Sequence, residues 1–90
     1  MKIYTITADV YASWGDVHPC YRIFVDGDLL TERVFTWSGH EAYIREHIEV
    51  NLMPGEHNLT IEQVGKAGKI QIKNITVDGV ASDYQFTIAE

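Results

Sequence analysis

The amino-acid sequence predicts an all-β protein, an antiparallel β-sandwich of about seven to eight strands. Three observations support this fold class. Apolar and polar residues alternate with a period of two in several short segments. Turns that contain glycine separate these segments at intervals of about ten residues. The chain has 90 residues, 46% of them apolar, so we expect residues 1–90 to form a single domain around one packed core.

The clearest of these segments is 48–62. Its apolar side chains alternate with polar ones on both sides of Pro54-Gly55, at Ile48, Val50, Leu52, Leu59 and Ile61. Proline fixes φ, and the glycine after it is free to adopt a positive φ, which is the chemistry of a reversing turn. We therefore expect two strands that form a hairpin, each with one buried face.

Two strands are predicted before this segment, in residues 1–12 and 20–26, with a loop between them. The expected buried side chains are Tyr4, Ile6, Ala8, Val10 and Ala12 in the first strand and Tyr21, Ile23 and Val25 in the second. The opposite face of the first strand, which includes Thr7, Asp9 and Tyr11, is expected to be mostly in contact with water.

A hairpin turn is predicted at Asp26-Gly27, because both residue types tolerate positive φ values. The returning strand, 29–37, carries large apolar side chains on both faces, so its core-facing side is not assigned. In residues 38–47, Ser38 and Glu41 fit a capping box, which favours a short helical turn through Tyr43-Ile44. A long loop between strands is an equal alternative.

The last third of the chain predicts two more strands. The apolar positions of residues 69–77 change from even to odd numbers near Lys73-Asn74, which indicates a β-bulge. Asp78-Gly79 then turns the chain, and residues 83–88 close it with alternating apolar positions.

The connections between strands differ in length, and the longer ones fall at one end. Successive connections in an antiparallel sandwich alternate between its ends. The tight turns Asp26-Gly27, Pro54-Gly55 and Asp78-Gly79 are the second, fourth and sixth. The first, third and fifth are the longer connections 13–19, 38–46 and 65–68, so they lie together. Because binding residues are often displayed on loops, we expect a ligand site there.

The candidate ligand-binding residues of this end are Trp14, Asp16, His18, Trp37, His40 and Tyr43. The aromatic rings could stack on flat apolar faces such as those of sugar rings, while the Asp and His side chains form hydrogen bonds. The alternative is that Trp14 and Trp37 cap the open end of the core.

No arrangement of residues predicts catalysis. A cysteine that opens an apolar strand, as Cys20 does beside His18, is more typical of an inert buried thiol than of a nucleophile. His40-Glu41 and His47 lack the H-E-x-x-H spacing of zinc proteases. Asp16, His18 and His40 could meet at a metal, but nothing in their spacing requires it. We predict that the protein is not an enzyme and has neither a metal nor a cofactor.

Charge excludes some partners. The formal net charge of −6 argues against nucleic acid and against anionic membrane surfaces as ligands. Lys66, Lys69 and Lys73 form the only cluster of cations and are predicted to be a solvated face.

Cys20 is the single cysteine, so no internal disulfide is expected. The start of the chain lacks the apolar run of a signal peptide, and no stretch reaches membrane-spanning length. We expect a soluble, cytoplasmic or virion-associated protein.

Three segments carry a resemblance to known proteins: Tyr21–Gly27, Val50–Ile61 and Ile70–Gly79. They resemble xylan-binding carbohydrate-binding modules, in which a V-D-G turn, an L-x-P-G-x-H-x-L hairpin and a late I-x-V-D-G recur. The resemblance implies a jelly-roll sandwich and glycan binding. Calcium-dependent members have an Asp-rich loop before the last V-D-G, whereas residues 65–69 here contain no carboxylate, so no calcium site is predicted. The chain is also similar to small proteins of tailed marine phages, which implies a structural or accessory role in a virion.

Two functions follow. The first is a non-catalytic binding module that holds a glycan at the long-loop end through Trp14, Trp37 and Tyr43. The second is a structural or protein–protein interaction protein, with a homo-oligomer as one form, that uses the apolar surface of the strand 29–37.

Overall fold

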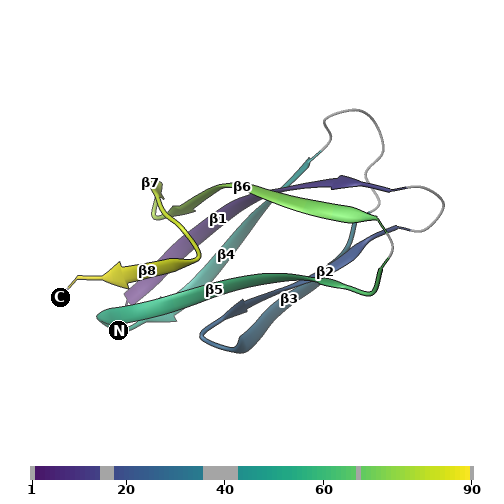
Figure 1. The fold of residues 1–90 in the computed structure, drawn as a ribbon. Helices are drawn as coiled ribbons and strands as arrows, with labels where there is room; N and C mark the ends of the chain where they lie inside the picture. Colours follow the sequence, from purple (N-terminus) through teal and green to yellow (C-terminus); the bar gives the residue numbers. More distant parts are fainter. Residues whose placement is uncertain (1, 15–17, 36–42, 67, 90) are drawn as a thin grey trace.

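The computed structural model describes residues 2–14, 18–35, 43–66 and 68–89, and these form only strands and turns (Figure 1). The strands are β1 (Lys2–Ser13), β2 (Cys20–Val25), β3 (Asp28–Val34), β4 (Tyr43–Leu52), β5 (Gly55–Val64), β6 (Lys69–Val77), β7 (Val80–Ala81) and β8 (Gln85–Ile88). The predicted all-β class is confirmed. Within the described residues, no helix is long and apolar enough to cross a lipid bilayer.

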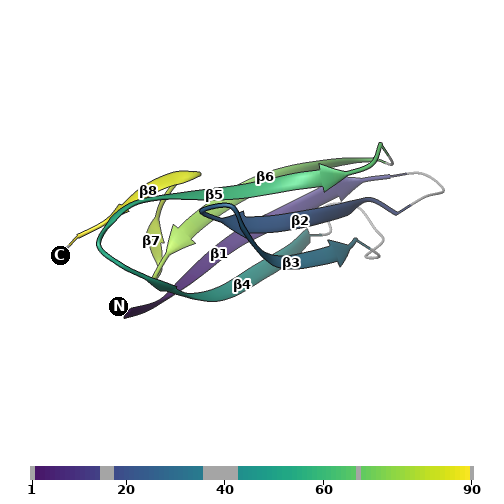
Figure 2. The same ribbon diagram turned by 90° about the horizontal axis from the view of Figure 1, so that it is seen from below.

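The strands form two antiparallel sheets that pack face to face. The first sheet has the order β4-β1-β6-β7, and the second has the order β3-β2-β5-β8. The β2–β3 hairpin of the second sheet continues as the β1–β4 pair of the first, and β5 and β6 then add beside β2 and β1. This folded ribbon is the arrangement of a jelly roll. The strands run along the long axis of the molecule, whose extents are 47 × 22 × 16 Å (Figures 1 and 2).

The predicted hairpin at Pro54-Gly55 is wrong, although the alternation around it is confirmed. β4 pairs with β1 in the first sheet, and β5 pairs with β2 and β8 in the second. The turn therefore carries the chain from one sheet to the other. Alternation and turn residues specify a reversal, but the partner of each strand is fixed by contacts distant in sequence, which a local pattern does not contain.

The core lies between the sheets and is built by the predicted faces of β1, β2 and β5. Its most buried aliphatic side chains are Ile6, Val10, Ile23, Val25 and Leu59. Strand β3 ends at Val34, earlier than expected, and Phe35 directly after it is fully buried. Leu29, Leu30 and Val34 of β3 are exposed, because β3 is the edge strand of its sheet.

Two turns and one bulge follow the prediction. Asp26-Gly27 and Asp78-Gly79 both combine two positive φ values, 53° with 84° and 50° with 81°, which is the type I′ geometry of tight hairpins. The β1–β6 register shifts between Thr7 and Asp9, and Asn74 opposite this shift has a φ of 55°. The bulge predicted near Lys73-Asn74 is confirmed.

Residues 43–47 differ from both alternatives that were considered for them. They belong to β4, which begins at Tyr43 and pairs with β1 from the Tyr11–Tyr43 position onward. The expected helical turn through Tyr43-Ile44 is wrong, because a full register of β1 pairing overrides a four-residue capping pattern. The capping residues Ser38 and Glu41 lie outside the described residues.

Candidate functional site

The flanks of the three longer connections meet at one end of the molecule, as predicted. Ser13 pairs with Lys69, and Cys20 pairs with both Val34 and Val64. These pairs place the ends of β1, β3 and β5 and the starts of β2 and β6 together. Figures 1 and 2 both show this end opposite the chain termini.

Of the six candidate residues, Asp16, Trp37 and His40 lie outside the described residues. Trp14 and His18 contact each other, with ring centroids 4.2 Å apart. The Nδ1 of His18 donates to the carbonyl of Phe35 at 3.1 Å, and half-buried Trp14 packs against the core. These internal contacts favour the interpretation in which Trp14 caps the end of the sandwich.

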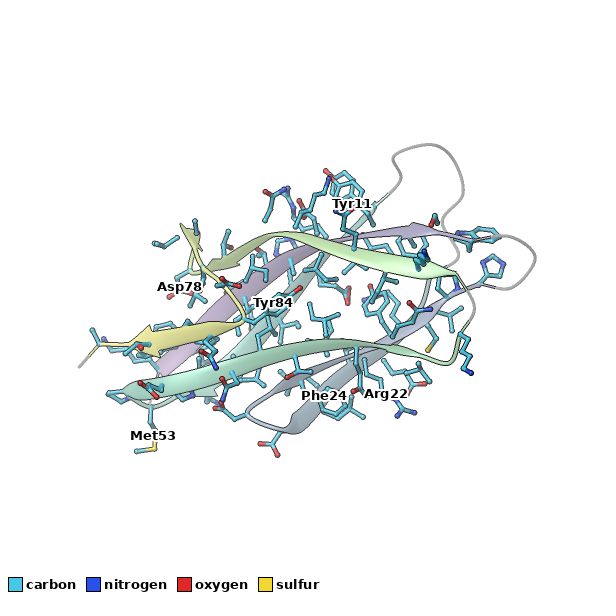
Figure 3. All side chains as sticks on the ribbon, in the orientation of Figure 1. Tyr11, Arg22, Phe24, Met53, Asp78 and Tyr84 are labelled. Carbon is cyan, nitrogen blue, oxygen red and sulfur yellow. The ribbon has the colours of Figure 1, made fainter. Side chains whose placement is uncertain are left out.

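Tyr43 begins β4 near the same end of the molecule, but it lies on the outer face of the first sheet. Its ring stacks on that of Tyr11 across the β1–β4 pair, with centroids 5.0 Å apart and planes at 30°. The Nζ of Lys73, from β6 on the other side of β1, lies 4.9 Å from the centre of the Tyr11 ring. Tyr11 is thus held between two neighbouring strands, while Tyr43 remains 43% exposed. Figure 3 shows Tyr11 on the side of the first sheet that faces away from the second.

A buried carboxylate supports this pair of rings. Asp9 is only 2% exposed although it belongs to the outer face of β1, so the prediction that this face is mostly wet is wrong at Asp9. Arg45 donates to it from Nε at 2.8 Å and from Nη2 at 3.3 Å, and the Nδ2 of Asn74 donates at 2.9 Å. The hydrogen bond from Arg45 lowers the pKa of Asp9, and that from Asn74 adds to this effect against the opposing effect of burial.

The local fold explains why these three residues meet. Arg45 occupies the position on β4 directly opposite Asp9. Asn74 reaches Asp9 because the bulge in β6 gives it a left-handed backbone, a conformation that asparagine tolerates better than most residues. The single sequence signal for this site was the change of alternation near Lys73-Asn74.

The resulting surface presents fixed hydrogen-bond donors beside an aromatic ring. We call Tyr11, Tyr43, Arg45, Gln71 and Lys73 the tyrosine platform. Asp9 uses two of the five N–H donors of Arg45, and the Arg45 side chain is 54% exposed. Gln71 lies directly opposite Tyr11 in the register. An open groove of about 430 Å³, lined partly by Tyr11, Lys69 and Gln71, adjoins the platform.

A second polar cluster lies at the opposite end of the molecule and is structural. The Nδ1 of His57 donates to Asp26 at 2.6 Å, and its Nε2 donates to the carbonyl of Met53 at 2.7 Å. The backbone N–H of Asn58 donates to the other oxygen of Asp26. Both ring nitrogens are therefore occupied, and the cluster joins the β2–β3 turn to the β4–β5 turn without a nucleophile among its members.

Another groove, of about 600 Å³, lies beside β7 and β8 and includes Tyr4 and Phe86 in its lining. Its two carboxylates serve the backbone. Asp78 accepts from the N–H of Thr5, and Asp83 accepts from that of Tyr84. Both carboxylates therefore already have a partner within the fold.

Cys20 shows no sign of activation. Burial raises the pKa of its thiol, and the nearby Glu32 raises it further. His18 bonds to a backbone carbonyl instead of to this thiol. Among the described residues, no three His, Cys, Asp or Glu side chains lie close enough to hold a metal ion.

Comparisons with family models, with curated protein sequences and with solved structures gave no match to this chain.

Proposed function

We propose that the protein is a non-catalytic carbohydrate-binding module whose site is the tyrosine platform. The observation that carries this proposal is the stacked Tyr11–Tyr43 pair, which lies on the outer face of the first sheet directly beside a half-exposed Arg45. Of the residues predicted from the sequence, the proposal retains Tyr43. It does not use Trp14 or His18, because their rings contact each other and the core side of the fold.

The platform has the two components that sugar recognition needs. An exposed aromatic ring offers an apolar face to the C–H groups of a pyranose, and neighbouring donors can bind its hydroxyl oxygens. Both components are held before a ligand arrives. Tyr11 fixes Tyr43 from one side, and Asp9 fixes Arg45 by two hydrogen bonds. Less side-chain freedom is then lost on binding, which favours affinity.

The test is retention on a panel of immobilised neutral and acidic oligosaccharides. Tyr43→Ala is expected to lower affinity at least about tenfold, the equivalent of one lost ring contact. Tyr84→Ala is the matched control, since Tyr84 is 42% exposed but precedes β8 in the second sheet. Circular dichroism of each variant verifies folding. The proposal is wrong if no oligosaccharide is retained, or if the two variants weaken retention equally.

A second function, protein–protein interaction, is favoured by the exposed apolar side chains of β3. Leu29, Leu30 and Val34 lie on an edge strand, and the outer edge of such a strand can pair with a strand of another chain. Light scattering after size exclusion tests the self-associating form. Dimers in the wild type that Leu30→Lys converts to monomers would support it, and a monomer at high concentration would count against it.

A further inference from the structure

We infer that the tyrosine platform selects acidic oligosaccharides, chains of uronic acids that carry a carboxylate on each sugar. This inference rests on the proposed function and names its ligand class. It is drawn from the way that charge is distributed over the two sheets.

Three of the seven cationic side chains of this acidic protein lie at the platform or beside it. Of the seven Lys and Arg residues, Arg45, Lys69 and Lys73 occupy the outer face of the first sheet. Outside this face, Arg22 and Arg33 form ion pairs with Glu32 and Glu46, as Arg45 does with Asp9. The other two cations are Lys2 at the start of β1 and Lys66 in the connection between β5 and β6.

Asp9, the acidic side chain that the described part of the chain places at the platform, is hidden from a ligand. Asp9 is 2% exposed and lies beneath Arg45 and Asn74, whereas the three cations reach the surface. Among the residues of this face that the structure describes around the platform, three positive charges and one negative charge sum to +2, against −6 for the whole chain. Glu49, the nearest exposed carboxylate along β4, is opposite Thr5, four residues or about 13 Å further along β1 than Asp9. A negative ligand therefore meets attraction at the platform and repulsion over most of the remaining surface.

The spacing of the cations favours a chain over a single sugar. Arg45 on β4 and Lys73 on β6 are both opposite Asp9 on β1, so they stand two strand spacings apart, about 10 Å. One sugar ring stacked on Tyr43 reaches Arg45 two residues along the same strand. A carboxylate on another sugar of the same chain is needed to reach Lys73 at the same time.

The experiment compares an oligogalacturonate of about four sugars with its methyl ester, which has the same skeleton without charge. We expect the ester to bind at least about tenfold more weakly in calorimetry, and the acid to lose affinity between about 20 and 200 mM NaCl. Lys73→Gln and Lys69→Gln should each reduce binding of the acid about twofold to fivefold. Lys2→Gln, which removes the same charge at the start of β1, should change it less than about twofold.

The outcomes separate the two proposals. Equal binding of acid and ester overturns the acidic preference and leaves the proposed function standing. If neither binds, and no other oligosaccharide of the panel does, the proposed function itself is wrong. Tighter binding of a single-stranded dT oligonucleotide than of the acid would assign the platform to nucleic acid and overturn the inference. Lys69 contacts no ring among the described residues, so its variant keeps the test independent of any disturbance of Tyr11 by Lys73→Gln.

Discussion

Replacing Gly68 by alanine tests whether the connection between β5 and β6 packs directly against the end of β1. Gly68 has a φ of +68°, and a Cβ added to it would lie 2.6 Å from the carbonyl oxygen of Ser13 and 3.0 Å from the Cβ of Trp14. Gly65, in the same connection, has a similar φ of +77°, but an added Cβ would have no atom within 4 Å. The two glycines thus share the backbone conformation and differ in the space around them.

The expected free energies follow from this difference. A left-handed backbone costs alanine about 1–2 kcal/mol, and loss of chain freedom in the unfolded state offsets about 0.4–1 kcal/mol of that. Gly65→Ala should therefore lower the free energy of unfolding by about 1 kcal/mol. In Gly68→Ala the methyl group also collides with a backbone oxygen at the end of β1, where Ser13 pairs with Lys69. Overpacking of this kind adds about 1–3 kcal/mol, for a total of about 2–4 kcal/mol.

Urea unfolding followed by tryptophan fluorescence and by far-ultraviolet circular dichroism measures both variants. The fluorescence of folded Gly68→Ala should also differ from that of the wild type, because Trp14 is one of the two residues that the methyl group meets. If Gly68→Ala and Gly65→Ala lower the free energy of unfolding by the same amount within about 0.5 kcal/mol, the connection does not pack against the end of β1 and this reasoning is refuted.

Two further predictions concern the polar clusters. Asp9→Ala leaves three hydrogen-bond donors of Arg45 and Asn74 without their acceptor. It should lower the free energy of unfolding in urea by about 1–3 kcal/mol and not more, because half-exposed Arg45 can be rehydrated. A loss under about 0.5 kcal/mol would contradict this. The hydrogen bond to Asp26 raises the pKa of His57 above 6.5, so its stabilisation is complete below pH 6.5 and is lost as the pH rises through the folded-state pKa. Unfolding midpoints measured from about pH 5.5 to about 8.5 should therefore fall more steeply in the wild type than in His57→Gln, and parallel curves would exclude this role of His57.

The parts of the fold that depend on neighbouring residues were predictable from the sequence. Alternation identified the buried faces of β1, β2 and β5, because the side-chain period of a strand is two. The Asp26-Gly27 and Asp78-Gly79 turns followed from residue types that tolerate positive φ. The break in alternation near Lys73-Asn74 located the bulge, since an extra residue must change the parity of the buried positions.

The parts that depend on distant residues were not predictable. Pro54-Gly55 reverses the chain as expected. Whether the strands on its two sides form a hairpin or cross between the sheets depends on their distant partners: β4 pairs with β1 in the first sheet, and β5 pairs with β2 in the second. The tyrosine platform was missed for the same reason. Asp9 meets Arg45 at a separation of 36 residues and Asn74 at a separation of 65, so no local pattern contains the site.

An ion pair on the outer face of a sheet adds little net stability compared with two neutral residues. The role of Asp9 and Arg45 in folding can therefore be separated by experiment from their role at the platform. Only Asp9 of this ion pair is buried, since the Arg45 side chain is 54% exposed. The pairing roughly balances the desolvation of the buried carboxylate, so replacing both partners by neutral residues is often harmless, whereas removing one is costly. We therefore expect Asp9→Thr/Arg45→Thr, with two β-favouring residues at paired positions of β1 and β4, to unfold within about 1 kcal/mol of the wild type and to be more stable than Asp9→Ala. Its affinity for oligogalacturonate should nevertheless fall about tenfold, because the fixed guanidinium beside Tyr43 is gone. A double variant that keeps both full stability and full affinity would show that Arg45 takes no part in binding, whereas one that is as unstable as Asp9→Ala would show that the pair exists to hold the sheet together.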